Sequence, residues 1–467
     1  MSDAQAEATG PAAPAGQRDD PAGVTAKSSP RWLQALGLHR RKLRAWALYD
    51  WANSAFATVI GAAVFPVFYA NVAAADLSAN EATVRYAFTG SAAMALVALL
   101  LPVLGAVADY LGAKKRMLGS FLALGALGTA TMFFIGRGDW MFASVLFVLG
   151  NVGLAGANVF YNSLLPHIAR EGEMDRVSSA GYALGYLGGG LLLTINLIWI
   201  VFPETIGIAD AETATRLSFV SVAVWWAGFS IPLFRRVPEP PRRLGQDEVA
   251  GMNPVRVGVT RLVKTFREIR GYRHAFLFLL AFLAYNDGIG TINGMAAAYG
   301  TEIGLGGPQL IGAILAVQFV AMPCTFLTGV LAGRLGTKRT LYLVLSVYVV
   351  ISGLAYFVTT TLHFYVLAIV VGAVIGGSQA LSRSLYASLI PRHKSAEFFA
   401  FLTIGSKFAG ILGPAIFGWV SLLAGSSRLS VLAIMAFFII GIVLLTRVDV
   451  PGGQRAARRA DRAFHSA

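Results

Sequence analysis

Long apolar runs recur along almost the whole chain, from Ala45 to near Thr446, and they decide what it can fold into. We count twelve runs that are long enough to cross ~30 Å of hydrocarbon, which takes about 20 helical residues each. Only 13% of the 467 residues are charged, whereas soluble domains carry roughly a quarter. We therefore predict an all-α membrane protein with twelve transmembrane helices. Little chain remains for a soluble catalytic or nucleotide-binding domain.

The positive charges predict how these helices are oriented. The formal net charge is +14, and if the first tail is cytoplasmic, few basic residues lie toward the outer side, namely Arg85, Arg137, Arg216 and Arg428. Cytoplasmic loops of membrane proteins carry such an excess of Lys and Arg, so the charge is explained without nucleic acid. The richness in alanine, glycine and arginine is typical of a GC-rich bacterium. We expect a multi-pass protein of a bacterial inner (cell) membrane with both termini in the cytoplasm.

An internal repeat predicts two related halves. "YNSLLP" at 161–166 recurs as "YASLIP" at 386–391, and "GAVADYLGAKK" from Gly105 recurs as "GVLAGRLGTKR" from Gly329 at almost the same offset. Because six spans per half is an even number, both halves enter the membrane from the same side. We predict two pseudo-symmetric six-helix bundles at 44–236 and 273–447. A cytoplasmic linker with an amphipathic helix is expected at 237–272, a disordered, basic tail at 1–43 and a basic tail at 448–467, both cytoplasmic.

Amides and charges inside the spans follow the same repeat, because they gather in spans 1, 4, 7 and 10. Polar groups are costly in lipid unless they face protein or water. These four helices are therefore expected to line one wetted central cavity. The residues concerned are Asp50, Asn53, Asn151, Asn158, Asn162, Asn286, Asp287, Asn293, Gln379 and Arg383.

Two charged residues lie unusually deep within their predicted spans. Asp287 lies at the midpoint of span 7, and Lys407 is comparably central in span 11. They are either partners or consecutive stops for a proton and a substrate, and the structural alternative is a permanent salt bridge that joins two helices. Asp50 lies near the cytoplasmic end of span 1, where it could also serve only as a helix cap. The span 4 asparagines could instead join helices by hydrogen bonds.

An acid at the C-terminal end of a helix opposes the helix dipole, and Asp109 is such an acid. We therefore expect it to have a cationic partner. The nearby Lys114 and Lys115 serve either as determinants of topology or as partners of Asp109 in an inner gate.

The chain lacks the residues of an enzyme or a metal protein. It has one cysteine, Cys324, and its six histidines are scattered. We find no nucleophile paired with a base and no metal-ligand cluster in the sequence. We expect no enzymatic activity, no cofactor and no metal.

Several segments resemble a known family. "GAVADYLGAKKR" resembles the loop 2–3 signature of the major facilitator superfamily. More narrowly, "YDWANSAFATVI", "YNDGIGTI", "GGSQALSRSLYASLIP" and "EFFAFLTIGSKFAGILGP" resemble the unknown-major-facilitator family, which includes the fungal vacuolar amino-acid effluxer of autophagy. The resemblance implies the major facilitator fold, alternating access, Asp109 at the cytoplasmic gate and, less directly, efflux of amino acids. The second half has Gly333 where the first has Asp109, so only one half carries the full gate.

We therefore predict a secondary active transporter of a small polar or zwitterionic, amino-acid-like solute, working by proton-coupled efflux. Its partners would be the solute, protons and the lipid bilayer, and it would be a monomer. Import of the same solutes, and a sensor or receptor that has lost transport, stay open. Asp287 is expected to couple the proton, and Asp109, Lys114 and Lys115 to form the cytoplasmic gate. The predicted substrate-binding residues are Asp50, Asn53, Asn158, Tyr161, Asn162, Asn286, Asp287, Gln379, Arg383 and Lys407.

Overall fold

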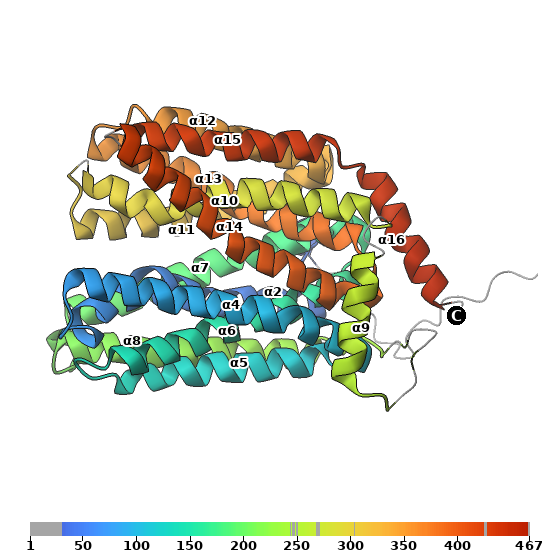
Figure 1. The fold of residues 1–467 in the computed structure, drawn as a ribbon, viewed down its shortest axis with the longest axis horizontal. Helices are drawn as coiled ribbons and strands as arrows, with labels where there is room; N and C mark the ends of the chain where they lie inside the picture. The colour runs from blue at the N-terminus through green and yellow to red at the C-terminus, as the bar shows by residue number, and fades with distance from the viewer. Residues whose placement is uncertain are drawn as a thin grey trace, which may run out of the picture.

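The computed structural model describes residues 30–465 except 243, 245–247, 249–250, 268–270, 303 and 425–426. Some helical side chains, most of them within 407–431, also lie outside the description. The described chain is all-helical, and Figure 1 shows its long helices as two bundles lying side by side. The twelve-helix fold predicted from the sequence agrees with this arrangement.

The first bundle holds the N-terminal helices and the second holds the C-terminal ones. The first contains α2 (Arg41–Ala55), η1 (Phe56–Ala63), α3 (Phe65–Phe68), η2 (Tyr69–Ala73), α4 (Ala79–Leu111), α5 (Lys114–Thr131), α6 (Trp140–Ile168), α7 (Met174–Val201) and α8 (Ala211–Arg236). The second contains α10 (Arg273–Glu302), α11 (Gly307–Leu335), α12 (Thr337–Ala355), α13 (Thr361–Leu389), α14 (Ser395–Ala424) and α15 (Ser427–Thr446). Below they are called the N-half and the C-half.

Nine single helices of the described chain are long and apolar enough to cross a membrane. A bent pair, Arg41–Ala63 with Phe65–Ala73, supplies the first span. The 20-residue α15 is followed after a 64° bend by a polar helix, so α15 alone supplies the last span. The 30-residue α14, some of whose residues are not described, completes the twelve.

The first span is the least regular. After α2 the chain continues as π-helical η1, and it bends by 40° where Pro66 enters the first turn of α3. Proline has no N–H to donate and therefore tends to start or kink a helix. π-Helical turns are rare, and they concentrate at functional sites. Of the two π-helical segments, η1 contributes residues to a cavity wall between the halves.

The repeated glycine motif lies where the halves touch. Helix α4 packs against α14, and α7 packs against α11. A Cβ atom on Gly105 would lie 2.8 Å from the carbonyl oxygen of Ala396, and one on Gly329 would lie 2.5 Å from the Ser179 side chain. Glycine is required at both positions because the opposite half approaches too closely for any side chain. The repeat therefore supplies the same close approach to each half.

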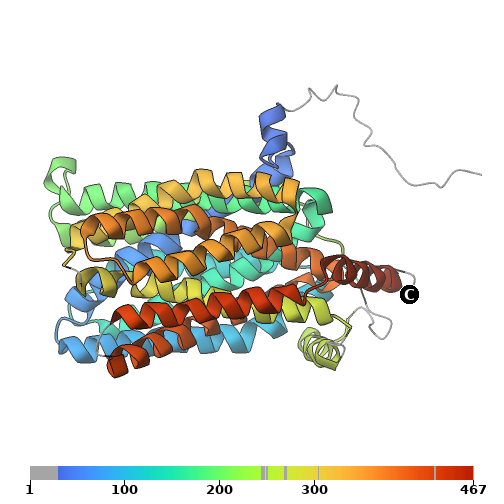
Figure 2. The same cartoon turned by 90° about the horizontal axis from the view of Figure 1, so that it is seen from above.

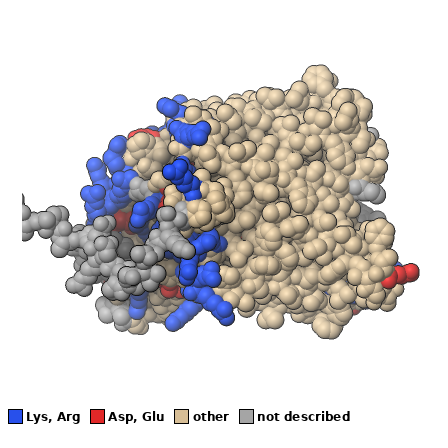
Figure 3. Space-filling model, turned by 180° about the vertical axis from the view of Figure 1, so that it is seen from behind, with Lys and Arg blue, Asp and Glu red and all other residues tan. Residues whose placement is uncertain are grey.

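Positive charge covers one end of the molecule, here called the basic end (Figure 3). Three surface helices lie there, as Figures 1 and 2 show: α1 (Arg31–Ala35), α9 (Pro254–Arg267) in the linker, and α16 (Val450–His465). Residues 448–467 were expected only as a basic tail. Most of them form α16, which packs against α10, α13 and the short helix η6 (Arg392–Lys394).

Candidate functional site

A cavity of about 920 Å³ lies between the two halves. It extends from Asp50 and Arg383 toward the end opposite the basic end, where Tyr299 and Phe364 lie close to the ends of α10 and α13. Asn293, on α10, is exposed. The polar lining residues are Asp50, Asn53, Ser54, Thr58, Tyr86, Asn158, Asn162, Tyr182, Tyr186, Asn293, Tyr299, Gln318, Ser352, Gln379 and Arg383.

The irregular first span forms much of the polar wall. The π-helical η1 contributes Thr58 and the small residues Ala57, Gly61 and Ala62. One turn earlier on α2, the Asn53 amide donates to the Asn158 side-chain oxygen of α6 at 2.7 Å. This hydrogen bond fixes the orientation of two lining amides within the N-half.

Asp50 and Arg383 form an ion pair across the two halves. A guanidinium nitrogen of Arg383 lies 2.9 Å from a carboxylate oxygen of Asp50, and their side chains are 3% and 8% exposed. Asp50 lies inside α2, so the alternative that it only caps the first helix is wrong. Removing one partner of a buried pair typically costs about 3–5 kcal/mol, because the other charge is left uncompensated. The pair therefore links the two halves at the base of the cavity, and neither charge can be removed alone without a large cost.

The Arg383 guanidinium has further partners in the N-half. It donates to the hydroxyl of Ser178 at 2.8 Å, to the carbonyl of Ser178 at 2.8 Å and to the Asn162 side-chain oxygen at 3.3 Å. Its carbon atom lies 4.1 Å from the ring centre of Tyr182 and 4.7 Å from that of Trp46. Hydrogen bonds and aromatic faces thus support one C-half cation entirely from the opposite half.

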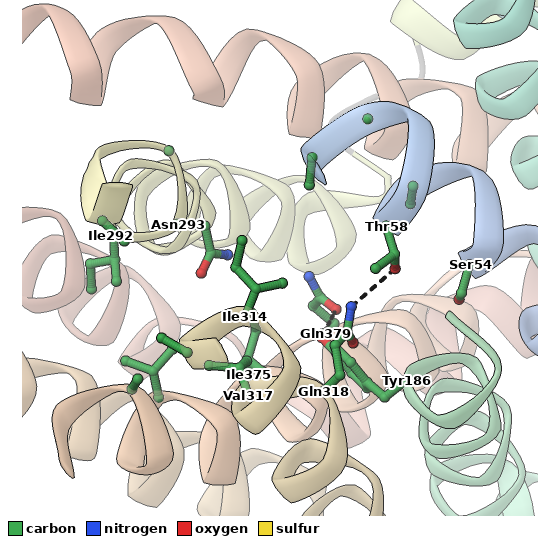
Figure 4. Close-up of a pocket in the computed structure, with 18 of the residues that line it drawn as sticks. Ser54, Thr58, Tyr186, Ile292, Asn293, Ile314, Val317, Gln318, Ile375 and Gln379 are labelled. Atoms are coloured by element: carbon green, nitrogen blue, oxygen red, sulfur yellow. Dashed lines mark hydrogen bonds between the residues drawn. The ribbon is translucent and has the colours of Figure 1, made fainter. Parts of the chain in front are cut away.

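Two neutral hydrogen bonds join the halves farther into the cavity (Figure 4). The Gln318 amide donates to the Thr58 hydroxyl at 3.0 Å, and the Tyr186 hydroxyl donates to the Gln379 side-chain oxygen at 2.8 Å. Figure 4 also shows Ile314, Val317 and Ile375 around the same space. All lining Ile, Leu, Val and Phe residues come from the C-half.

Polar contacts close the basic end beneath the ion pair. The Lys114 ammonium lies 2.8 Å from Asp109 and donates to the Ser395 hydroxyl of the C-half at 2.6 Å. Asp109 also accepts the backbone N–H of Glu397 at 3.0 Å, at the beginning of α14. Asp109 therefore has the cationic partner that its position on α4 requires.

Lys115 does not take part in this closure. Its ammonium donates to the Phe234 carbonyl at 2.9 Å, and its backbone N–H donates to Glu239 at 3.0 Å, so its described contacts lie at the end of its own half. The expectation that it joins an inner gate is not met in this conformation. A different residue adds to the closure, because Asp175 of α7 accepts from Ser384 at 2.5 Å and from Thr337 at 2.6 Å.

Asp287 does not line the cavity, although its depth in span 7 suggested that it would. It is buried, but it is absent from the cavity lining, and its backbone carbonyl lies against Gly413 of α14. Neither carboxylate oxygen has a hydrogen-bond partner among the described residues. The side chain of Lys407 lies outside the described residues, so the predicted pair is not tested.

Three further residues of the predicted lining lie elsewhere. The Asn151 amide donates to the Phe147 carbonyl of its own helix at 3.0 Å, and Asn151 is absent from the cavity wall. Asn286 is half-buried and does not contribute to the cavity wall. Tyr161 is fully buried behind that wall, where its ring stacks on Trp46 with centroids 4.5 Å apart. Of the span 7 residues predicted to line the cavity, only Asn293 does so. Span 7 therefore lines the cavity as predicted, but through Asn293 and not through Asn286 or Asp287.

Sequence reasoning missed several polar residues at the base of the cavity and at the basic end. Ser178, Tyr182 and Ser395 bind or face charged partners across the two halves. Glu397 is fully buried, and neither carboxylate oxygen has a hydrogen-bond partner in the described part of the chain. A fully buried acid at a helix start could have been suspected from "KSAEFF", which places it directly before an apolar run.

Two bundles of six helices around a central cavity are the arrangement of the major facilitator fold. A structure of the transporter FucP in its outward conformation aligns with a TM-score of 0.65 at 11% identity, covering 88% of this chain and 100% of that chain. At that identity the likeness shows the fold alone. The sequence comparisons go further.

The family model for vacuole effluxer Atg22-like proteins matches residues 81–458, and the chain belongs to that family. An uncharacterised MFS-type transporter of Bacillus subtilis, YxiO, is 38% identical over 86% of this chain and 94% of its own length. Autophagy-related protein 22 of Kluyveromyces lactis is 25% identical over 74% of this chain and 75% of its own length. The protein is thus a multi-pass membrane transporter and not an enzyme.

Proposed function

We propose that this protein exports a small zwitterionic, amino-acid-like solute from a bacterial cell by alternating access coupled to protons. The observation that carries the proposal is the Asp50–Arg383 pair at the base of a cavity between two halves. Opposite charges at one site suit a ligand that itself carries an ammonium and a carboxylate group. Membership of the Atg22-like effluxer family supports the direction.

The two charges would bind the two ends of the solute. The planar guanidinium of Arg383 suits a carboxylate, with which it can form two parallel hydrogen bonds. Asp50 would bind the ammonium, and Asn53, Asn158, Asn162 and Gln379 would orient the solute from the cavity wall. The apolar residues of the C-half would contact an apolar side chain of the solute. In the solute-free state the two charges neutralise each other.

Alternating access explains why the contacts between halves cluster at one end. If the basic end is cytoplasmic, as the positive-inside pattern predicts, both termini are cytoplasmic and this conformation is closed to the cytoplasm. Opening the basic end would separate Asp50 from Arg383, Lys114 from Ser395 and Asp175 from Ser384. A solute that replaces the first contact would lower the cost of that separation.

Buried acids are the candidates for proton coupling. Asp287 and Glu397 are both buried without a hydrogen-bond partner among the described residues. A lone carboxylate is costly to keep charged in such surroundings, and a bound proton removes that charge. Glu397 lies at the contact between the halves, whereas Asp287 lies within the C-half and away from the cavity wall, so protonation of Glu397 would act on the closure and protonation of Asp287 on the packing of the C-half.

Transport in proteoliposomes tests the proposal. We expect uptake or release of a zwitterionic amino acid that accelerates with an imposed pH gradient, and we expect Arg383→Gln to abolish it. Asp287→Asn that keeps full gradient-driven transport would remove the coupling role of that residue. Solute binding without any flux would contradict transport and favour a receptor.

A further inference from the structure

A second, smaller cavity lies at the basic end, away from the central one. Its volume is about 310 Å³, and three parts of the chain enclose it. Pro166 and Met174 belong to the N-half, Ser388 and Arg392 to the C-half, and Arg458 and Arg462 to α16. Nothing in the transport proposal uses this space. Its wall joins both halves to the C-terminal helix.

The charge of this wall favours an anion. Three arginines and one acid, Asp461, contribute side chains to it. Asp461 already binds the His393 ring nitrogen at 2.8 Å and the Arg392 backbone N–H at 3.1 Å. Its carboxylate therefore helps to hold α16 in place. With three arginines to one acid, the wall carries an excess of positive charge, and guanidinium is the side chain best matched to a phosphate group.

The docking of α16 fixes where its exposed arginines stand beside the cavity. The His393 ring stacks on Phe464 with centroids 4.1 Å apart. The Gln454 amide donates to Ser388 at 3.3 Å, next to the cavity. A Cβ atom on Gly453 would lie 2.5 Å from the Leu389 side chain, so the helix lies close against the end of α13. These contacts position α16, which carries Arg458 and Arg462 one turn apart beside the cavity.

We infer that this cavity binds a phosphate-bearing anion, either free phosphate or the headgroup of an anionic lipid. Basic pockets at the cytoplasmic ends of transmembrane helices commonly bind such headgroups. A ligand here would contact both halves and α16 together, and so it would stabilise the conformation in which the basic end is closed. This consequence rests on the proposed alternating access, whereas the binding itself does not.

Thermal unfolding of the purified full chain in detergent tests the site, at constant ionic strength. The probes are inorganic phosphate, dioctanoyl phosphatidic acid and, as the zwitterionic control, dioctanoyl phosphatidylcholine. The test variant is Arg458→Gln with Arg462→Gln. The matched control is Arg455→Gln with Arg459→Gln, which removes two charges from the same helix without touching the cavity wall.

We expect an anionic probe to raise the Tm of the wild type and of the control variant, because a ligand that binds only the folded state stabilises it. The test variant should need at least a tenfold higher concentration of the same probe.

A response to inorganic phosphate identifies the phosphate group as sufficient, and a response to phosphatidic acid alone identifies the lipid. An equal response of the two double variants, or no response of the wild type to either anion, would overturn the inference. Matching Tm values without ligand show that the test variant folds. Because no step measures flux, failure here leaves the transport proposal intact.

Discussion

The two walls of the central cavity differ, although the two halves share one repeat. The N-half wall consists of one acid, amides, hydroxyls, tyrosines and small residues, whereas the C-half wall holds every lining Ile, Leu, Val and Phe. The C-half also contributes six polar lining residues, of which Arg383 is the charged one. The repeat thus preserves the backbone and its glycine contacts, while the side chains facing the cavity have become specialised. We interpret this difference as a division between recognition of charge and recognition of apolar shape.

The largest effect is expected from removing the one charge on the C-half wall, that of Arg383. Arg383→Gln leaves Asp50 uncompensated in a buried site, which should cost about 3–5 kcal/mol of stability and abolish transport. Asp50→Asn combined with Arg383→Gln should recover much of the stability but not the transport. Thermal unfolding and proteoliposome flux measure the two effects. If the double variant is as unstable as the sum of the singles, the two residues are not coupled.

The C-half wall should set the preference among solutes. Ile314→Ala together with Val371→Ala removes side-chain atoms from the apolar wall and enlarges the space beside it. We expect the preference to shift toward bulkier solutes by about 1–3 kcal/mol, or roughly 10–200-fold. Ser54→Ala on the N-half wall should leave that ranking unchanged. Competition of unlabelled amino acids against a labelled one gives the ranking. A larger shift from Ser54→Ala than from the C-half pair would contradict the division of roles.

The hydrogen bonds between the walls should have a smaller effect. Thr58→Val and Tyr186→Phe each remove one neutral bond between halves, worth about 0.5–1.5 kcal/mol. We expect a modest change in the balance between the two access states, seen as altered labelling of cysteines introduced at either end of the cavity. Tyr365→Phe, which removes a hydrogen bond made within the C-half, is the control that should leave this balance unchanged.

The smallest effect concerns pH and α16, outside the membrane. Burial lowers the pKa of His393 below its ordinary value, although the neighbouring Asp461 opposes the shift. The folded state then binds the proton less readily than the unfolded or undocked state, so docking of α16 is strongest above the ordinary histidine pKa of about 6.5 and weakens as pH falls below it. Hydrogen exchange of the α16 amides at pH 7.5 and 5.5 measures this. His393→Gln should remove the pH dependence.

The fold followed from the sequence because apolar length, charge asymmetry and the repeat each depend on local pattern alone. The site followed only in part. Depth along a helix can be counted, and it placed Asp287 near the middle of span 7, but the direction of a side chain turns by about 100° per residue. A few residues separate a position on the cavity wall, such as Asn293, from one against α14, such as Asp287.

The central ion pair illustrates the other limit. Asp50 and Arg383 were each recognised as polar residues facing inward, but their pairing depends on how the two halves are docked. The π-helical segment after Asp50 was also invisible, because "FATVIGAA" has the composition of an ordinary apolar helix. The sequence therefore left open the contacts between elements far apart in the chain and the local winding of the first span.

The π-helical turns of η1 make part of the cavity wall adjustable. A π-helical turn contains one residue more than an α-helical turn. The position of that extra residue can shift along the helix without changing the length of the span. Moving it past one position would swing the intervening side chains by about 100° while both ends of the helix stay anchored. Thr58 could then leave Gln318 and present a different neighbour to the solute by local rewinding, before either bundle moves as a whole.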